Sequence, residues 1–416
     1  MKARELRIIV PLAWRNVWRN KRRTILTLLT ILVGCAMIIL MNAFSKGGHD
    51  RMIEDATSMN AGHIQIHEKG YWDSRTIDYA FRMSTELEHM LRGDPRVAGY
   101  SLRVHADGLL SFGESTAGAM IQGVDPVMEK KVGSIHTRIL KGGRYLKQGD
   151  SRHIVMGETL AKNLGASTGD RIVMISQGFD GSIAAERLEV VGLFRSGNPE
   201  YDQALIVMPL SQAAETFTMM GYVHSCAIRL RSSSDMERVR DGLRAVTGLP
   251  DTIEVLGWDE LMPELVQFIV MDDIQAYIFD FILFMIVAFG ILNTIQMSVF
   301  ERTREFGVML AIGTRPDQVI SIVLVESFFI SIMGIALGIA LGAGISYYYW
   351  INPIDFSSYS EEMAVWGVST VIYPADATAL NLLMTAIVTF VLALVFSIFP
   401  ARRASRLRPI EAIRHL

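Results

Sequence analysis

The stretch Thr24–Phe44, TILTLLTILVGCAMIILMNAF, contains 21 residues and no charged side chain. A hydrocarbon core about 30 Å thick is crossed by roughly 20 predominantly apolar residues in a helix. The stretch therefore predicts a transmembrane helix over residues 24–44. It is longer than the apolar region of a typical signal peptide, and no Ala-x-Ala cleavage pattern follows it, so we expect a membrane anchor.

Three further apolar stretches follow in the second half of the chain and predict helices over residues 274–299, 318–349 and 379–399. The first of these holds Asp280 and the second holds Glu326. Ionisable groups inside membrane spans are costly and often functional. We expect Asp280 to reach water at the outer end of its span and Glu326 to face the bundle or the interface, and a functional role for each stays open.

Lysine and arginine are concentrated at both ends of the chain. Residues 1–23 contain eight basic side chains and one acidic one, residues 400–416 contain five and one, and residues 351–378 contain no basic side chain. Because short cytoplasmic segments carry the excess of Lys and Arg, we expect a multi-pass membrane protein with both termini in the cytoplasm. The cytoplasmic segments are then an amphipathic entry helix at 1–23, a loop at 300–317 and a tail at 400–416.

Residues 45–273 are predicted to be extracytoplasmic, as is the connection at 350–378, and 45–273 is long enough for a folded domain. Apolar or alternating runs predict strands near 63–67, 118–122, 153–156, 171–175, 188–192 and 204–208, and helical windows occur at 85–92, 158–164, 211–219 and 235–246. The ends of the insert, 45–58 and 258–271, predict helical stalks that continue the adjoining spans. We therefore expect four transmembrane α-helices with a large α+β extracytoplasmic domain inserted between helices 1 and 2.

The composition excludes several classes of protein. Half of the 416 residues are hydrophobic and 20% are charged, against about 25% charged in soluble proteins. The net charge of −3 argues against a nucleic-acid partner, and two cysteines exclude a disulfide scaffold. The sequence holds no HExxH or GxSxG motif and no GxxxxGK loop, so we expect no catalytic residue, no metal site and no ATPase activity in this chain. We interpret His63, His67 and Cys226 as packing residues.

The third span contains Gly334, Gly338 and Gly342 at intervals of four residues. Small residues at this spacing permit the close approach of helices in lipid, where apolar burial alone gives no driving force. The pattern predicts a helix-packing face, and it leaves open whether the partner helix belongs to the same chain or to a second one.

Four segments carry recognisable motifs in chain order: AWRNVWRNKRRT at 13–24, GETLAKNLGASTGD at 157–170, ERTREFGVMLAIGT at 301–314 and PARRASRLRPIEAIR at 400–414. The last two resemble the loop after the second span and the closing segment of FtsX/MacB-type ABC transporter permeases. The first two are similar to the entry helix and to an outer-domain motif of that family. Within the family, the length and the four spans are most similar to the lipoprotein-releasing permeases of the LolC/LolE group.

The resemblance implies a permease of the bacterial inner membrane that works as a homo- or heterodimer with cytoplasmic ABC ATPase subunits. ATP and Mg would be bound by that partner ATPase, and no cofactor is expected in this chain. The coupling residues are then expected on a short helix that docks on the ATPase and relays its motion outward by mechanotransmission. These residues are Glu301, Arg302, Arg304 and Glu305.

The same resemblance implies release of lipoproteins, or of another amphipathic substrate, to an extracytoplasmic carrier or adaptor protein. A groove for lipid or substrate, in contact with membrane lipids along the second span, is expected near Met271, Ile278 and Phe281. The alternative is MacB-like efflux of periplasmic drugs, peptides or other small molecules. A ligand sensor without an ATPase is less favoured, because the short cytoplasmic segments leave no room for a signalling module.

Overall fold

The computed structural model describes residues 3–245, 250–356 and 372–407, and the chain divides into two compact units. The first, here called the helical unit, is formed within residues 1–51, 268–355 and 372–416. The second, here called the sheet domain, is formed mainly by residues 52–267. Parts of the predicted 350–378 connection and of the 400–416 tail lie outside the described residues.

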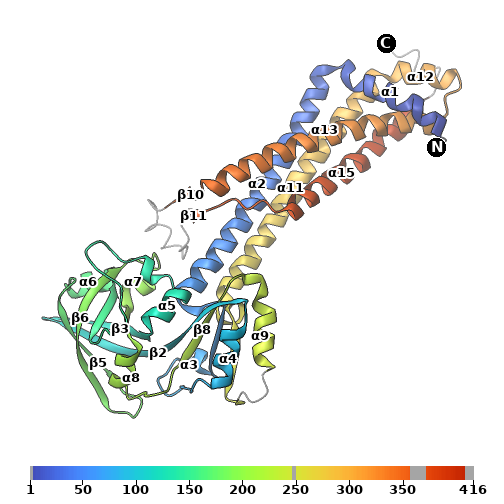
Figure 1. Ribbon diagram of the computed structural model, residues 1–416. Coiled ribbons are helices and arrows are strands. Elements are labelled where there is room, and N and C mark those ends of the chain that lie inside the picture. Colours follow the sequence, from blue (N-terminus) through green and yellow to red (C-terminus); the bar gives the residue numbers. More distant parts are fainter. Residues whose placement is uncertain (1–2, 246–249, 357–371, 408–416) are drawn as a thin grey trace. The chain divides into compact units, whose positions relative to one another are not determined.

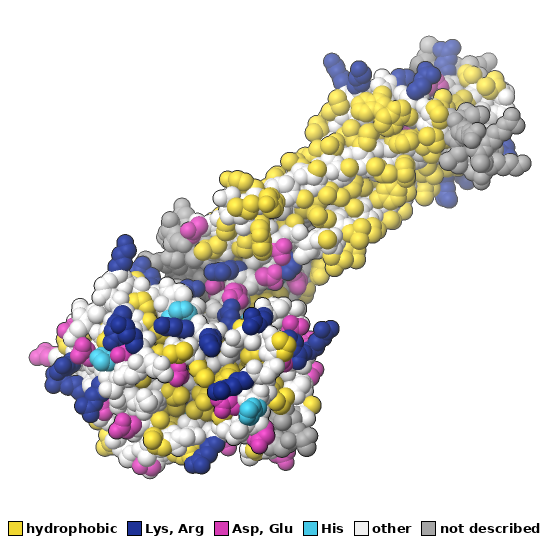
Figure 2. Space-filling model, in the orientation of Figure 1, with side chains coloured by type: hydrophobic (Ala, Val, Ile, Leu, Met, Phe, Trp, Pro, Cys, Tyr) yellow, Lys and Arg dark blue, Asp and Glu magenta, His cyan; other side chains and the backbone are white. Residues whose placement is uncertain are grey.

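The helical unit contains four helices long and apolar enough to cross a membrane. They are α2 (Lys21–Ala56), α11 (Pro263–Glu301), α13 (Pro316–Ile351) and α15 (Ala379–Ser405). Each is longer than the span predicted from the sequence, because the helix continues through the polar residues at one or both ends. Two shorter helices, α1 (Ala3–Arg19) and α12 (Thr303–Ala311), complete the unit (Figure 1). The visible surface along the long helices is largely apolar (Figure 2).

Small residues bring α13 close to α2. A Cβ atom added to Gly334 would stand 2.8 Å from Ile31, and one added to Gly338 would stand 2.7 Å from the Cβ of Cys35. Gly342 likewise lies against Ile39. The three glycines predicted for helix packing therefore face a helix of the same chain. Two short antiparallel strands, β10 (Ile354–Asp355) and β11 (Ile372–Tyr373), follow α13 and precede α15.

The sheet domain is built on nine strands in the order β3-β7-β4-β6-β5-β2-β8-β1-β9, and β3 also pairs with β2. Six strands, β2 to β7, therefore close into a ring, and β8, β1 and β9 extend the sheet from β2 (Figure 1). The pairs β3–β7 and β4–β6 are parallel, and the others are antiparallel. The strands are β1 (Ile64–Glu68), β2 (Val97–Phe112), β3 (Ser115–Val124), β4 (His153–Gly157), β5 (Arg171–Gln177), β6 (Ile183–Phe194), β7 (Leu205–Pro209), β8 (Ser225–Leu230) and β9 (Ile253–Gly257).

Short helices cover this sheet. They are α3 (Tyr71–Ser74), α4 (Thr85–Gly93), α5 (Pro126–Val132), α6 (Glu158–Leu164), α7 (Pro199–Ala204), α8 (Leu210–Thr216), α9 (Met236–Arg244) and α10 (Trp258–Leu261). Side-chain caps define several of their starts: the carboxylate of Asp125 accepts hydrogen bonds from the backbone N–H groups of Val127 and Met128, and Pro126 occupies the first turn of α5. The larger of two apolar clusters in this domain includes Val104, Ile121 and Ile228, and the smaller includes Val124 and Val207.

The six strands and four helices predicted in this part of the chain are confirmed within a few residues. At the ends of the insert, α2 continues to Ala56 and α11 begins at Pro263, whereas Trp258–Leu261 forms the separate helix α10. That these ends act as stalks stays a prediction. Strands β2, β8 and β9 were not predicted. His63, His67 and Cys226 are buried, as expected of packing residues.

Candidate functional site

The predicted coupling segment forms a helical corner between α11 and α13. α11 ends at Glu301, and Arg302 breaks the helix with φ −107° and ψ 14°. α12 follows and is closed by Gly313, whose φ of +98° is accessible to glycine at little cost. Pro316 then occupies the first turn of α13, where its missing N–H is not needed.

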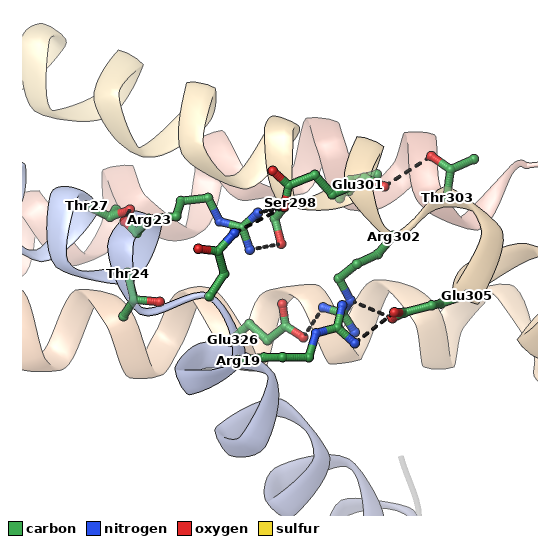
Figure 3. Close-up of polar contacts among 12 residues, drawn as sticks. Arg19, Arg23, Thr24, Thr27, Ser298, Glu301, Arg302, Thr303, Glu305 and Glu326 are labelled. Atoms are coloured by element: carbon green, nitrogen blue, oxygen red, sulfur yellow. Dashed lines mark hydrogen bonds and ion pairs between the residues drawn. The ribbon is translucent and has the colours of Figure 1, made fainter. Parts of the chain in front are cut away.

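Arg302 turns into the protein and forms a buried ion pair. Its Nη1 donates to Oε1 of Glu326 over 2.7 Å, and the Nδ2 of Asn16 donates to the same oxygen over 2.7 Å. The Arg302 Nε donates to Oε2 of Glu305 over 3.0 Å, and its guanidinium lies 4.9 Å from the ring centre of Phe306. Arg302 therefore links α12 to α13 (Figure 3), and the Glu326 carboxylate links both to α1 through Asn16.

The burial of this pair decides its energetic role. Arg302 is 6% exposed and Glu326 is 8% exposed. Burial opposes the charged form of Arg302, but the carboxylates of Glu326 and Glu305 raise the pKa of its guanidinium above the ordinary value. Breaking a buried pair by removing one partner costs about 3–5 kcal/mol, because the other charge is left uncompensated. The pair therefore holds the helical corner in one arrangement.

A second set of contacts lies nearer the surface. Nη1 of Arg19 lies 2.8 Å from Oε1 of Glu305, and Arg23 donates to Oε2 of Glu301 over 2.6 Å and to Oγ of Ser298 over 3.0 Å (Figure 3). Exposed ion pairs contribute only about 0–1 kcal/mol each. These contacts position α1 and the start of α2 against the corner, and they contribute less than the buried pair.

The four predicted coupling residues do not form one surface. Arg302 is engaged in the buried ion pair with Glu326. Glu301 binds Arg23 of α2, and Glu305 binds Arg19 of α1. Arg304 is exposed. Sequence reasoning missed Asn16, Arg19 and Arg23 as partners, and it did not connect Glu326 with Arg302. The sequence did hold an indication of this ion pair, because the carboxylate of Glu326 lies inside an apolar span and such a group needs a partner of opposite charge.

The exposed face of α12 instead carries one cation and two apolar side chains. Arg304 and Val308 lie four residues apart, and Ile312 follows directly after the helix at the same spacing, so all three point to one side. Ile312 is 77% exposed and Val308 is 43% exposed, whereas Phe306 on the opposite side is fully buried in a cluster with residues of α13 and α15. We call Arg304, Val308 and Ile312 the α12 face.

Asp280 was predicted to reach water at the outer end of its span, and its side chain is partly exposed. It turns toward α2, where the Nδ2 of Asn42 donates to its Oδ2 over 2.9 Å. Its Oδ1 is buried and has no hydrogen-bond partner among the described residues. A polar side chain of the neighbouring helix thus binds one carboxylate oxygen, and the contact of Asp280 with water stays a prediction.

The residues predicted to line a lipid or substrate groove lie on one side of α11. Met271, Ile278 and Phe281 are all exposed, and their spacing of seven and three residues places them along a single stripe of the helix. These three side chains are exposed, as are other apolar residues of α11, and the groove itself stays a prediction.

Comparison with known proteins defines the class. A model of the MacB-like periplasmic core domain matches residues 24–246, and a model of the FtsX-like permease C-terminal region matches residues 277–409. The chain belongs to the FtsX/MacB-type family of ABC transporter permeases.

Individual relatives include two differently named groups. The lipoprotein-releasing system transmembrane protein LolC of Xylella fastidiosa is 25% identical over 406 residues, which cover 94% of this chain and 93% of that protein. The macrolide export ATP-binding/permease protein MacB of Pectobacterium atrosepticum is 21% identical over 95% of this chain and 58% of that protein, and the MacB of Chlorobium luteolum is 24% identical over 98% and 60%. This chain therefore spans about three fifths of the length of these MacB relatives.

Among solved structures, the periplasmic region of MacB from Actinobacillus actinomycetemcomitans aligns with a TM-score of 0.36 at 14% identity, over 50% of this chain and 94% of that one.

Proposed function

We propose that the chain is the transmembrane subunit of an ABC transporter that works by mechanotransmission, and that the α12 face docks on a partner ATPase that binds ATP and Mg²⁺. The observation that carries the proposal is the division of α12 into two sides. Arg302 and Phe306 fix one side within the helical unit, and Arg304, Val308 and Ile312 leave the other side uncovered. A short amphipathic helix with exposed apolar anchors is suited to binding in a groove of another protein.

The buried ion pair supports transmission of force from this helix. A displacement of α12 that kept Arg302 bonded to Glu326 would move α13, and the bond from Asn16 would carry α1 with it. In this proposal α12 faces the cytoplasm, where the basic residues of the chain ends also lie. The sheet domain is extracytoplasmic, and the unbroken α2 and α11 connect it to the membrane. A second permease chain, identical or different, completes the transporter.

The proposed cargo is a lipoprotein released from the inner membrane to an extracytoplasmic carrier or adaptor. The match to LolC supports this cargo, because it covers nearly the whole of both chains. The outward stripe of Met271, Ile278 and Phe281 offers an apolar surface to an acyl chain within the bilayer. MacB-like efflux of a periplasmic small molecule is the second candidate, and it is favoured by the matches to proteins named for macrolide export.

Depletion of the chain in its source bacterium separates the two candidates. Lipoproteins are labelled with radioactive palmitate, and the inner and outer membranes are then separated. We expect labelled lipoproteins to accumulate in the inner membrane after depletion and to leave it again when the wild-type chain is restored. Normal lipoprotein sorting together with increased sensitivity to macrolides would reject lipoprotein release in favour of efflux.

A further inference from the structure

One side of the sheet in the sheet domain carries buried polar residues where a core would normally be apolar. Gln65 and Ser101 both pair with Ala227, and His105 pairs with Gln122. Residues directly opposite each other in a sheet share a face, and alternate residues of one strand do so too. Gln65, Ser101, His105 and Gln122 therefore lie on the same side of the sheet, opposite Val104 and Ile228 of the larger apolar core. Gln122 shares this side with its pairing partner Val207, which belongs to a second apolar cluster.

Two amides on this side are buried without complete hydrogen bonding. Gln65 is 1% exposed and Gln122 is 3% exposed, and neither Oε1 of Gln65 nor Nε2 of Gln122 has a hydrogen-bond partner among the described residues. By contrast, the neighbouring Arg103 forms two bonds to Glu129, of 2.7 and 3.1 Å. An unsatisfied buried donor or acceptor costs about 1–3 kcal/mol, so the two amides require an explanation.

Both amides line a cavity of about 180 Å³. Its wall also includes Tyr71, Trp72 and His105. Sites for drug-sized ligands usually measure about 300–1,000 Å³. The cavity is too small for a macrolide or for the acyl chains of a lipoprotein, so it is not the cargo site of the proposed function.

Apart from two exposed side chains, the lining of the cavity is uncharged near neutral pH and combines polar with apolar residues. Burial is the main cause that lowers the pKa of His105 well below its ordinary value, and the neighbouring His224 adds to the effect, so the imidazole of His105 is neutral. Two charged side chains, Arg75 and Asp107, also line the cavity but are exposed to solvent. The guanidinium of Arg75 lies over the ring of Trp72, 4.1 Å from its centre.

This combination defines the chemistry of a ligand. We propose that the cavity binds a small zwitterion with an uncharged carboxamide end, whose amide N–H donates to Gln65 and whose carbonyl accepts from Gln122. The charged end of the ligand would remain at the opening, with its ammonium group near Asp107 and its carboxylate near Arg75. L-Glutamine, with about ten non-hydrogen atoms, has this chemistry and a size suited to the cavity.

The probe is free L-glutamine, titrated calorimetrically into the full-length chain in lipid nanodiscs. We expect saturable binding. L-Glutamate has the same shape, but it would bring a carboxylate into an interior without a counter-charge, so we expect at least about tenfold weaker binding. Gln65→Met and Gln122→Met keep the side-chain length and remove the bonding groups, and each should weaken glutamine binding about fivefold to tenfold.

Two further measurements make the result decisive. Gln212→Met removes a buried glutamine outside the cavity, which bonds to Thr216, and it should leave glutamine affinity unchanged. Thermal unfolding checks that the Gln65→Met and Gln122→Met variants fold, which is expected because each removes an unsatisfied group. Absence of glutamine binding to the wild-type chain would overturn the proposal. Equal affinity for glutamate, or undiminished binding by the two cavity variants, would overturn it as well.

Discussion

Replacing Arg302 with methionine is expected to destabilise the helical corner by about 3–5 kcal/mol. Both partners of the ion pair are over nine-tenths buried, and the shortest nitrogen-to-oxygen distance is 2.7 Å. Removal of the guanidinium would leave the Glu326 carboxylate buried with Asn16 as its remaining hydrogen-bond donor among the described residues. The cost therefore comes from the carboxylate that stays behind, as well as from the lost bond.

A double-mutant cycle separates these contributions. Glu326→Leu alone is also expected to be costly, because it strands a buried arginine. The double variant Arg302→Met with Glu326→Leu should recover most of the stability, since apolar replacement of a whole buried pair is often neutral or stabilising. We expect the two substitutions to be non-additive by at least about 2 kcal/mol.

The assay is the free energy of unfolding of the purified chain in detergent micelles, measured by denaturant titration. Arg315→Met is the matched control, because Arg315 pairs with Asp317 over 3.2 Å at an exposed position where an ion pair contributes about 1 kcal/mol or less. The reasoning would be refuted if Arg302→Met were as mild as the control, or if the two substitutions were additive.

Three other predictions test separate parts of the structure. Gly338→Val should destabilise the contact of α13 with α2 by about 1–3 kcal/mol, because the new Cβ would stand 2.7 Å from the Cβ of Cys35. Gly344→Val, with no described neighbour within 4 Å, should not destabilise this contact, and thermal unfolding compares the two variants. Burial lowers the pKa of His224 to about 4, so between pH 6.5 and 4 the unfolded chain binds more protons than the folded chain. The stability present above pH 6.5 should therefore be lost as the pH falls toward 4. Hydrogen exchange of the sheet domain should show a smaller loss of stability in His224→Gln than in the wild-type chain. Met271→Ala should slow lipoprotein release, while Met384→Ala, at an exposed position of α15, should not, and equal effects in the palmitate assay would contradict the proposed groove.

The four long helices could be predicted from the sequence because uninterrupted apolar length is a strong signal that depends on no distant contact. Strand β2 was not predicted because it depends on contacts with a distant part of the chain. It contains Asp107-Gly108, a pair typical of turns. Pairing with β3 from Arg103 to Phe112 keeps this pair in an extended conformation, and that pairing is a tertiary contact which a local pattern does not contain.

The coupling segment shows the same limit. Its position after the second span and its charged residues could be predicted from the sequence. Which of the charged side chains turn inward could not. Arg302 and Arg304 are two residues apart, and the first is buried because Glu326, 24 positions away, lies opposite it. Apolar spacing within the segment could have indicated Val308 and Ile312 as the exposed pair only once the buried position of Phe306 was known.

The α12 face is tested most directly by co-purification of an ABC ATPase with the tagged chain from membranes of the source bacterium. Ile312→Asp places a charge on the most exposed apolar side chain of the α12 face, and Ile183→Asp is the control, since Ile183 is 82% exposed in the sheet domain. The account predicts that the wild-type chain and Ile183→Asp retain the ATPase, and that Ile312→Asp retains at least about tenfold less. Equal retention by Ile312→Asp and Ile183→Asp would contradict the account.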